Sequence, residues 1–264
     1  MSEQRGPTVA LVHAPSPHLE HGQRTHLAVS EIDFHLAREQ HAAYCETLRQ
    51  CGAEVVTLDT NLDSPDGVFV EDAAVVLDEV AVIASMGTAA RRAETPAIEL
   101  ALARHRPIHR IELPAKLEGG DVLRVGRELI VGLSSRTDAA GARALEAITR
   151  PLGYRVRAVK VHGCLHLKTA CTAIDEETLL VNPDWLETTA LADYRLLPVP
   201  PAEPWAANLL RLNDRLLLAA AHVRTAELLA GLGHRLAPID ISEFAKAEGG
   251  VTCLSILFQD DRRS

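Results

Sequence analysis

A short polar cluster followed by an apolar run recurs five times along this chain, and this recurrence limits the possible folds more than any other feature. The anchoring positions 71, 118, 166, 208 and 253 are separated by 47, 48, 42 and 45 residues. The clusters are Glu71-Asp72, Glu118-Gly119-Gly120-Asp121, His166-Leu167-Lys168, Ala207-Asn208, and Gly249-Gly250 leading to Cys253. A step in this range is typical of a repeated supersecondary unit.

Each repeat has the same internal pattern. Two apolar runs meet across a short polar turn, which indicates a β-hairpin, and their near-continuous apolar character predicts strands covered on both faces. The hairpins are DVLRV-GRE-LIVGL, ACTAI-DEE-TLLVN and NLLRL-NDR-LLLAA. A helical segment and another strand follow, as in RTDAAGARALEAITR and YRVRAVKV. The order is therefore β-β-α-β, with Thr137, Thr225 and Ser242 as the expected helix caps.

The last unit is incomplete, because VTCLSILF has no partner strand after it. The N-terminal part supplies the missing pieces: strand TVALVHA, a helix from about Asp33 to Gln50, and strand AEVVTLD. Pairing the two ends would close five units into a ring without exposed sheet edges. The sequence thus predicts an α/β fold, a five-bladed pseudosymmetric propeller of ββαβ units forming one domain over residues 1–264. An open α/β sheet is the alternative.

Composition narrows the function classes. The 36 acidic and 27 basic residues give a formal net charge of -9, which argues against a nucleic-acid or anionic-membrane binder. Aromatic residues make up only 3% of the chain, too few for base-stacking platforms. The odd number of cysteines, five, leaves at least one thiol free, and no apolar run or signal-peptide pattern indicates a membrane span or export. We therefore expect a soluble cytoplasmic protein.

If the ring closes, its polar clusters converge near the axis, and their residue types indicate chemistry there. Cys253 is either a small buried hydrophobe or a nucleophilic thiolate beside His166. Glu118 could orient that histidine as the third member of a nucleophile–base–orienter set. Glu71 and Asp72 form either a solvated turn or, with Asp66 nearby, an acidic bed for a cation such as a guanidinium. Asp121 is expected to bond turn amides.

A structural zinc site is a rival interpretation. His162, Cys164 and His166 would share one face of a predicted strand, at about 6.6 Å between neighbours. At most two of them could bind one zinc ion, so a second element would have to help. Of the other cysteines, Cys45 and Cys51 are expected to pack in the core, and Cys164 and Cys171 to be strand residues.

Seven motifs occur in a characteristic order: FVEDAAVV at 69–76, ARRAE at 90–94, LEGGDVL at 117–123, GLSSRT at 132–137, LHLKT at 165–169, AAN at 206–208 and GGVTC at 249–253. Together they resemble the dimethylarginine dimethylaminohydrolases, which belong to the guanidino-group-modifying enzymes. The resemblance covers about residues 8–258. It implies the five-bladed α/β propeller of that superfamily, the pentein fold, and hydrolysis of Nω-methylated arginines to citrulline and methylamine or dimethylamine.

The resemblance also implies a role for each matching residue. Cys253 matches the nucleophile, His166 the general acid/base and Glu118 the acidic residue beside it. The implied substrate contacts are Asp66, Phe69, Glu71, Asp72, Arg91, Arg136 and Ala247. Among these, the two arginines match the sites near the substrate α-carboxylate, and the carbonyl of Ala247 matches a contact to the amino group.

The expected partner is a small methylated arginine, with no metal or organic cofactor, and a homodimer stays open. The chain departs from the family at its N-terminal lid, EHGQRTH at 20–26, where Gln23 or Arg24 replaces a frequent leucine.

Other functions stay open on the sequence. An arginine deiminase would use the same groups on unmethylated arginine, although that family generally carries an inserted helical domain and the helical segments here are short. An amidinotransferase would need an acceptor amine in place of water. Outside enzymes, the alternatives are an inactive ring that binds arginine-like ligands and a zinc-binding protein.

Overall fold

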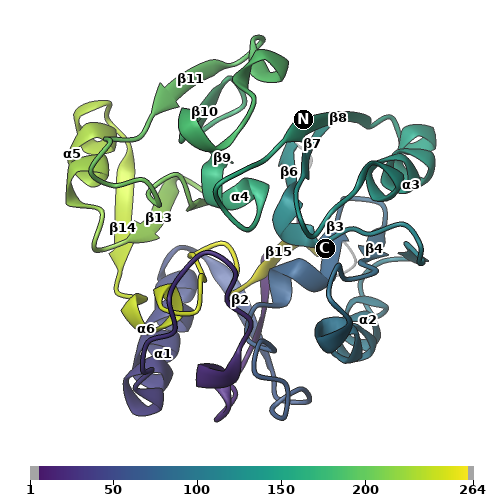
Figure 1. Cartoon of the computed structure of the whole chain (residues 1–264), viewed down its shortest axis with the longest axis horizontal. Coiled ribbons are helices and arrows are strands. Elements are labelled where there is room, and N and C mark those ends of the chain that lie inside the picture. The colour runs from purple at the N-terminus through teal and green to yellow at the C-terminus, as the bar shows by residue number, and fades with distance from the viewer. Residues whose placement is uncertain (1–5, 261–264) are drawn as a thin grey trace.

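The computed structural model describes residues 6–260, which form five three-stranded sheets around a common centre (Figure 1). In chain order, the first three sheets are β15 (Ile256–Gln259), β1 (Thr8–His13) and β2 (Ala53–Leu58); β3 (Ala74–Val76), β4 (Ala81–Ile83) and β5 (Ile108–Arg110); and β6 (Val122–Val125), β7 (Glu128–Leu133) and β8 (Arg155–Lys160). The other two are β9 (Cys171–Ala173), β10 (Thr178–Val181) and β11 (Arg195–Pro198); and β12 (Leu209–Leu212), β13 (Arg215–Ala219) and β14 (Arg235–Ile239). One continuous open sheet, the alternative expectation, is therefore wrong.

Every sheet has the same strand pairing, which confirms the predicted repeat. The middle strand pairs antiparallel with one neighbour and parallel with the other, as in β6–β7 and β7–β8. An α-helix bridges the parallel pair in four sheets: α1 (Phe34–Gln50), α2 (Thr95–Leu102), α3 (Ala139–Thr149) and α5 (Val223–Gly231). Between β10 and β11 the link is instead two 3-10 turns, η6 (Pro183–Trp185) and η7 (Thr188–Leu191).

Shorter helical turns connect the remaining segments. They are η1 (Leu19–His21), η2 (Val70–Ala73), η3 (Ala89–Glu94), η4 (Gly119–Asp121), η5 (Arg150–Leu152), α4 (Leu167–Ala170) and α6 (Ser242–Ala245). Three of them, η2, η4 and α4, contain residues of a polar cluster of the sequence repeat. These three clusters therefore form helical turns at the start of a hairpin.

The helix starts differ from the expected caps. Asp138, and not Thr137, caps α3 by accepting the Gly141 amide at 2.8 Å. The Thr137 hydroxyl instead accepts the Glu118 amide at 3.0 Å, so it is committed to another segment. Thr225 lies inside α5, where its hydroxyl donates to Glu203, and Ser242 is the first residue of α6. The expected start of α1 is confirmed by Asp33, which accepts the Leu36 amide at 3.1 Å.

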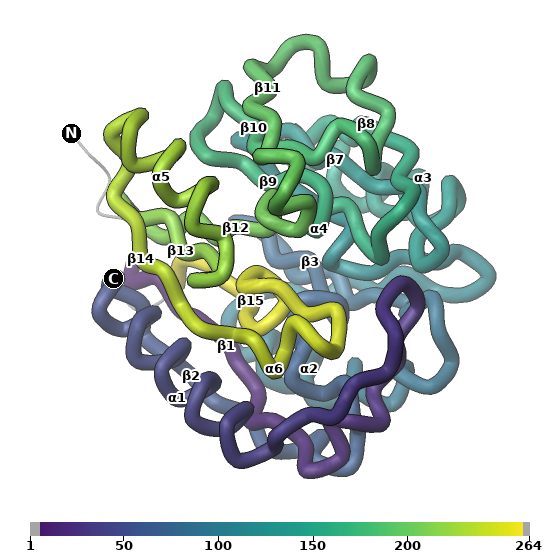
Figure 2. The backbone as a smooth tube through the Cα atoms, turned by 60° about the vertical axis from the view of Figure 1, so that its left-hand side comes forward, coloured from purple at the N-terminus to yellow at the C-terminus, as the bar shows by residue number. Residues whose placement is uncertain are grey.

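The two ends of the chain pair with each other, as predicted. β15 runs antiparallel to β1, with Thr8 opposite Gln259 and Leu11 opposite Ile256. The C-terminal strand therefore completes a sheet whose other two strands come from the N-terminal part (Figure 2).

The packing explains why the strands lack polar alternation. Five apolar cores are each shared by two neighbouring sheets, and one of them joins the β12–β14 sheet to the β1 sheet. Successive side chains of a strand point to opposite faces. In β1, Val9 and Leu11 enter one core while Ala10 and Val12 enter the next. Both faces of the strand are buried, so both sets of positions are apolar.

One strand from each sheet lines a central pocket of about 380 Å³. These strands are β3, β6, β9, β12 and β15. The five sheets therefore face one another through equivalent strands. Within residues 6–260, no helix combines the length and the apolar character needed to span a membrane. All five cysteines are free and buried, in line with the core packing expected for Cys45 and Cys51.

Candidate active site

A second, smaller cavity collects most of the predicted site residues. It is lined by Gln23, Asp66, Phe69, Asp72, Arg91, Arg136, Leu165, His166, Ala247, Glu248, Gly249 and Cys253. Eight of the ten residues singled out in the sequence are in this set, and the two exceptions are Glu71 and Glu118. Residues almost 190 positions apart thus meet in one place, as the converging clusters predicted.

His166 and Glu118 form a buried pair at this cavity. The Nε2 of His166 lies 2.7 Å from Oε2 of Glu118, and the glutamate is completely buried behind the ring. The second oxygen, Oε1, accepts the Gly87 amide at 2.8 Å and lies 3.7 Å from Nη1 of Arg136. These contacts fix the carboxylate, and the carboxylate in turn fixes the plane of the imidazole.

The acids around His166 decide its charge. Burial by itself lowers the pKa of this imidazole, but Asp72, Glu118 and Asp121 more than offset that effect and raise the pKa to about 9. The ring is therefore protonated at neutral pH and can act as an acid. Its Nδ1 lies 3.6 Å from Oδ1 of Asp72, on the side opposite Glu118.

Asp72 keeps one carboxylate oxygen without a hydrogen-bond partner. Its Oδ2 accepts from Nη1 of Arg91 at 2.5 Å, whereas the buried Oδ1 has no hydrogen-bond partner among the described residues. Although burial favours the neutral acid, His166 and Arg91 hold the pKa of Asp72 below its ordinary value. The cavity thus contains an ionised carboxylate with a free acceptor, and a buried acceptor of this kind is costly unless a ligand supplies a donor.

Arg91 is almost fully occupied by the protein. It donates to both Glu94 oxygens, to Asp72, and to the carbonyl of Phe69 at 3.0 Å. Glu94 follows at i+3 in the predicted motif ARRAE, but sequence reasoning did not assign it a role. The spacing, which places both side chains on one face of a helical turn, was the available signal.

Asp121 acts over a long range and not within its own turn, contrary to expectation. Its Oδ1 accepts the Leu167 amide at 2.8 Å, and its Oδ2 accepts the Ser134 hydroxyl at 2.6 Å. Burial raises the pKa of Asp121 to about 6. Since Leu167 follows His166 directly, Asp121 holds the segment that positions the imidazole. Gly120 is needed beside it, because a Cβ there would lie 2.8 Å from the His166 ring.

The segment around His166 is not a strand, so the predicted shared face of His162, Cys164 and His166 is wrong. Residues 163–166 form bends after β8, and the Cys164 thiol donates to the His166 carbonyl at 3.4 Å. The positive φ of Gly163 turns the chain at this point. Among the described residues, the one group of potential ligands close enough to hold a metal is Asp72, Glu118 and His166. Among residues 6–260, His162 and Cys164 belong to no such group.

Cys253 lies at the end of a loop that several contacts fix. Its Sγ accepts the Gly250 amide at 3.3 Å. The neighbouring Thr252 is held by Asn208, which accepts its amide at 3.1 Å and donates to its hydroxyl at 3.1 Å. Burial, together with Glu71 and Asp72, raises the pKa of the Cys253 thiol to about 12. Without a ligand the thiol is therefore protonated at neutral pH.

Helix α1 supports the same loop. The buried Tyr44 hydroxyl donates to the Val251 carbonyl at 2.8 Å and lies 2.8 Å from the Ser255 hydroxyl. These two contacts flank Cys253 on both sides along the chain. Sequence reasoning missed Tyr44, because nothing local in α1 shows which loop the helix covers.

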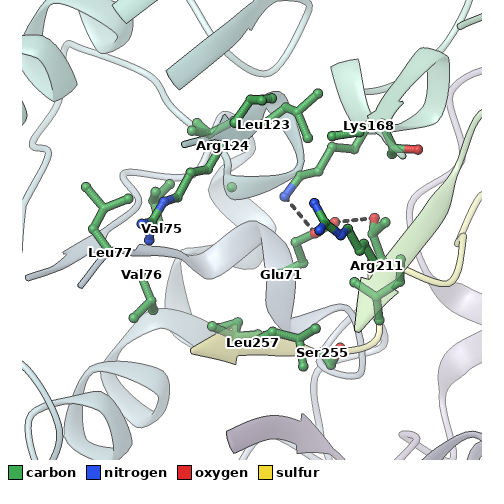
Figure 3. Close-up of a pocket in the computed structure, with 18 of the residues that line it drawn as sticks. Glu71, Val75, Val76, Leu77, Leu123, Arg124, Lys168, Arg211, Ser255 and Leu257 are labelled. Atoms are coloured by element: carbon green, nitrogen blue, oxygen red, sulfur yellow. Dashed lines mark hydrogen bonds and ion pairs between the residues drawn. The ribbon is translucent and has the colours of Figure 1, made fainter. Parts of the chain in front are cut away.

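Glu71 lines the central pocket and not the smaller cavity. Its Oε1 accepts from Lys168 at 2.6 Å and its Oε2 accepts from Thr252 at 2.6 Å. Figure 3 shows the Glu71 and Lys168 side chains pointing toward one another at the wall of the central pocket, with Val75, Leu123 and Leu257 around it. Burial raises the pKa of Glu71, and Lys168 and Thr252 offset this only in part. Its predicted contact with a guanidinium stays a prediction.

We call residues 22–33 the lid segment, since they overlap and extend the lid expected at 20–26; Gln23 of this segment lines the small cavity. The Gln23 amide donates to both oxygens of Asp66, at 3.2 and 3.1 Å. Glu248 accepts the amides of Thr25, His26 and Leu27. The cavity that remains has about 20 Å³, enough for one water but not for an amino acid. An amino-acid ligand therefore requires residues that line this cavity to move apart.

Comparisons with known proteins agree with this fold. The arginine deiminase family model matches residues 60–216, which places the chain in that class of α/β proteins. It is 45% identical to an N(G),N(G)-dimethylarginine dimethylaminohydrolase of Streptomyces coelicolor, over 95% of this chain and 97% of the relative. The chain belongs to the family of dimethylarginine dimethylaminohydrolases.

Solved structures show the same relationship. The dimethylarginine dimethylaminohydrolase of Pseudomonas aeruginosa, as a Cys→Ser mutant complexed with citrulline, superposes with a TM-score of 0.89 at 33% identity, covering 96% of this chain and 100% of that one. A dimethylarginine dimethylaminohydrolase His→Gly variant, in an adduct with S-methyl-L-thiocitrulline, has a TM-score of 0.91 at 33% identity with the same coverage.

Proposed function

We propose that this protein hydrolyses Nω-methylated L-arginines to L-citrulline and methylamine or dimethylamine, with residues 1–264 acting as one catalytic domain. The observation that carries the proposal is the meeting of three features in one cavity: a cysteine, a protonated histidine, and the free carboxylate oxygen of Asp72. The names of the relatives and the citrulline complex of the Pseudomonas protein support the substrate class.

The substrate guanidinium binds at Asp72. Its N–H groups supply the donor that Oδ1 lacks, and a charge-assisted hydrogen bond of this kind is stronger than a neutral one. Docking fixes the guanidino carbon in front of Cys253. Orientation of this sort can contribute about 7–11 kcal/mol to lowering a barrier. The bound cation also lowers the pKa of the thiol, because a positive charge nearby favours the thiolate.

Catalysis then proceeds in two steps. The Cys253 thiolate attacks the guanidino carbon, the bond from that carbon to the methylated nitrogen breaks, and His166 gives its proton to the departing amine. General acid catalysis of this kind contributes about 10²–10⁴-fold. A covalent thiouronium remains on the sulfur. The thiol proton of Cys253 leaves to solvent before the attack, where the released amine can take it up. His166, now neutral, takes one proton from water, and the water oxygen attacks the same carbon. The carbon–sulfur bond then breaks, the second proton of that oxygen returns to the sulfur, and neutral citrulline leaves.

The rest of the substrate extends toward the lid. Arg136 is better placed than Arg91 to bind the α-carboxylate, because its contacts to Glu118 and Thr25 are long, at 3.7 and 3.5 Å, whereas Arg91 is occupied. Phe69 packs edge-on against Phe244, with 6.5 Å between ring centroids, and gives the alkyl chain an apolar wall. The carbonyl of Ala247 and the carboxylate of Asp66 receive the α-amino group.

We infer that the five sheets are the blades of a closed propeller, the pentein fold. The pairing of β1 with β15 and the chain of five shared cores support this inference. In that arrangement the Glu71–Lys168 pair separates the active-site cavity from the central pocket. The cytoplasmic location, the homodimer and the absence of a nucleic-acid or membrane partner stay predictions from the sequence.

Product analysis tests the function. The protein is incubated with arginine and with its mono- and dimethylated forms, and citrulline, ammonia and methylated amines are measured. We expect citrulline with dimethylamine or methylamine. Citrulline and ammonia from unmethylated arginine would instead identify an arginine deiminase, the alternative that the matching family model favours.

Two cysteine variants test the assignment of Cys253 as the nucleophile. Cys253→Ser is expected to abolish citrulline formation without loss of the fold, which circular dichroism and thermal melting check. Cys51→Ala, at a buried thiol at the end of α1, is the matched control and is expected to keep its activity. Wild-type turnover in the Cys253 variant would refute the nucleophile assignment.

A further inference from the structure

Glu248 binds the lid through one carboxylate oxygen. Its Oε1 accepts three consecutive backbone amides, those of Thr25 at 2.7 Å, His26 at 2.6 Å and Leu27 at 2.8 Å. The residue has a backbone φ of 63°, in the left-handed region that side chains other than glycine rarely adopt. Its carboxylate is therefore held between the lid and the loop that ends at Cys253.

The other oxygen of the same carboxylate has no partner. Oε2 of Glu248 is buried without a hydrogen bond among the described residues, and the residue is only 7% exposed. Within residues 6–260 Glu248 forms no ion pair, and it lines the active-site cavity. A buried carboxylate oxygen in this state is costly unless a donor arrives from a ligand.

The neighbouring acceptors define what that donor is. Asp66 and Ala247 line the same cavity and are the groups expected at the substrate amino end. A primary ammonium has three N–H donors, as the lysine side chain does, and two acceptor groups leave one of them over. Oε2 of Glu248 is the third acceptor. Both Asp66 and Glu248 also accept amides of the lid, so the ammonium and the lid share two carboxylates.

Building on the proposed function, we propose that Glu248 is a specificity-determining residue: Oε1 holds the closed lid, and Oε2 binds the α-ammonium of the substrate. A guanidino compound with a free α-amino group supplies the hydrogen-bond donor that Oε2 lacks. A compound without that group leaves Oε2 buried and unbonded. The site therefore selects free amino acids over guanidino acids that lack the amino group.

Replacement of Glu248 by glutamine separates the two roles. The glutamine Oε1 can still accept the three lid amides, while an NH2 group, which is a donor, replaces Oε2. The two substrates are asymmetric dimethylarginine and 5-(N,N-dimethylguanidino)pentanoate, which lacks only the α-amino group. In E248Q we expect kcat/KM for dimethylarginine to fall by roughly 10–100-fold, mainly through KM, since a hydrogen bond to a charged group is lost.

The desamino substrate supplies the internal comparison. We expect its kcat/KM in E248Q to stay within about threefold of the wild-type value, so that the preference for the amino group shrinks by roughly tenfold or more. Hydrogen exchange at residues 25–27 shows whether the lid contact persists. Glu31→Gln removes an exposed carboxylate from the same lid segment and is expected to change neither substrate.

The outcomes distinguish this inference from the proposed function. A wild-type protein that hydrolyses dimethylarginine, with an amino-group preference that E248Q does not alter, overturns the role of Glu248 alone. Equal losses for both substrates show a lid contact without ammonium binding and also overturn it. If the wild type hydrolyses no methylated arginine, calorimetric binding of citrulline and 5-ureidopentanoate is compared in the same variants. A failure to bind citrulline overturns both proposals.

Discussion

The charge of His166 is the property most directly set by the geometry, and replacing Glu118 with glutamine tests it. In the wild type, the pKa rises from 6.5 to about 9 although burial alone would lower it. At about 1.36 kcal/mol per pKa unit, this corresponds to roughly 3 kcal/mol in favour of the imidazolium in the folded state. The glutamine keeps an oxygen for the Gly87 amide but removes the negative charge 2.7 Å from Nε2. We expect the pKa to fall by at least about one unit.

The sign of the effect on stability follows from linkage. A group whose folded pKa lies above its unfolded pKa stabilises the protein fully below the unfolded value, and that stabilisation is lost as pH rises through the folded value. For His166 the window runs from 6.5 to about 9. In the Glu118 variant, protonation of His166 stabilises the folded state at low pH by less than it does in the wild type. The difference in the free energy of unfolding between wild type and variant should therefore narrow by at least about 1.4 kcal/mol between pH 6 and pH 9.5.

Urea unfolding at a series of pH values measures this difference. The loss of the contacts of Glu118 to Gly87 and Arg136 lowers the free energy of unfolding of the variant by an offset that cancels when the values at two pH points are compared. Glu112→Gln, at an exposed acid before the same loop, is the control and should show no narrowing. The charge assignment for His166 is refuted if the difference in the free energy of unfolding between wild type and E118Q stays constant within about 0.5 kcal/mol from pH 6 to pH 9.5.

Three further results are expected. Gly120→Ala places a Cβ 2.8 Å from the His166 ring and should lower kcat by more than tenfold, whereas Gly231→Ala, which meets no atom within 4 Å, should leave kcat unchanged in the same assay. Tyr44→Phe leaves the Val251 carbonyl without its donor and should reduce the free energy of unfolding by about 1–3 kcal/mol, measured in urea; no change would mean that this hydrogen bond does not stabilise the loop. Alkylation of Cys253 by iodoacetamide should accelerate about tenfold per pH unit between pH 7 and 10, because its pKa is about 12; a plateau near pH 8 would contradict that value.

The repeated unit could be predicted because each strand has the same physical environment. A strand between two apolar cores needs apolar residues on both faces, so the hairpins stand out as nearly unbroken apolar runs. The link between β10 and β11 did not follow the pattern, since it contains 3-10 turns where the other units have a helix. The caps of α3 and α5 were wrong for a related reason. Thr137 and Thr225 are good local candidates, but each hydroxyl bonds a segment distant in sequence, and another residue takes the cap position.

The same distinction between local patterns and long-range contacts applies to the site residues. The gathering of Cys253, His166, Asp66 and Asp72 at one cavity could be predicted because short motifs carry them and because chemistry restricts which residue types are candidates; their roles stay predictions. The residues that position them could not be predicted. Tyr44 reaches Ser255 across 211 residues, and Asp121 reaches Leu167 across 46. Such contacts depend on how the sheets pack, and a single sequence contains no record of which helix covers which loop.

Geometry also explains how a site so rich in acids can use a thiol at all. Burial, together with Glu71 and Asp72, keeps the Cys253 thiol protonated, and His166 is protonated as well, so a cavity without ligand holds neither a thiolate nor a neutral imidazole. A guanidinium changes this because it brings a positive charge to the free oxygen of Asp72 and so favours the thiolate. Citrulline is neutral at the same position and cannot do so. In the proposed mechanism, the charge that the reaction removes from the substrate is thus the charge that ionises Cys253, and the thiol is protonated again once citrulline has formed.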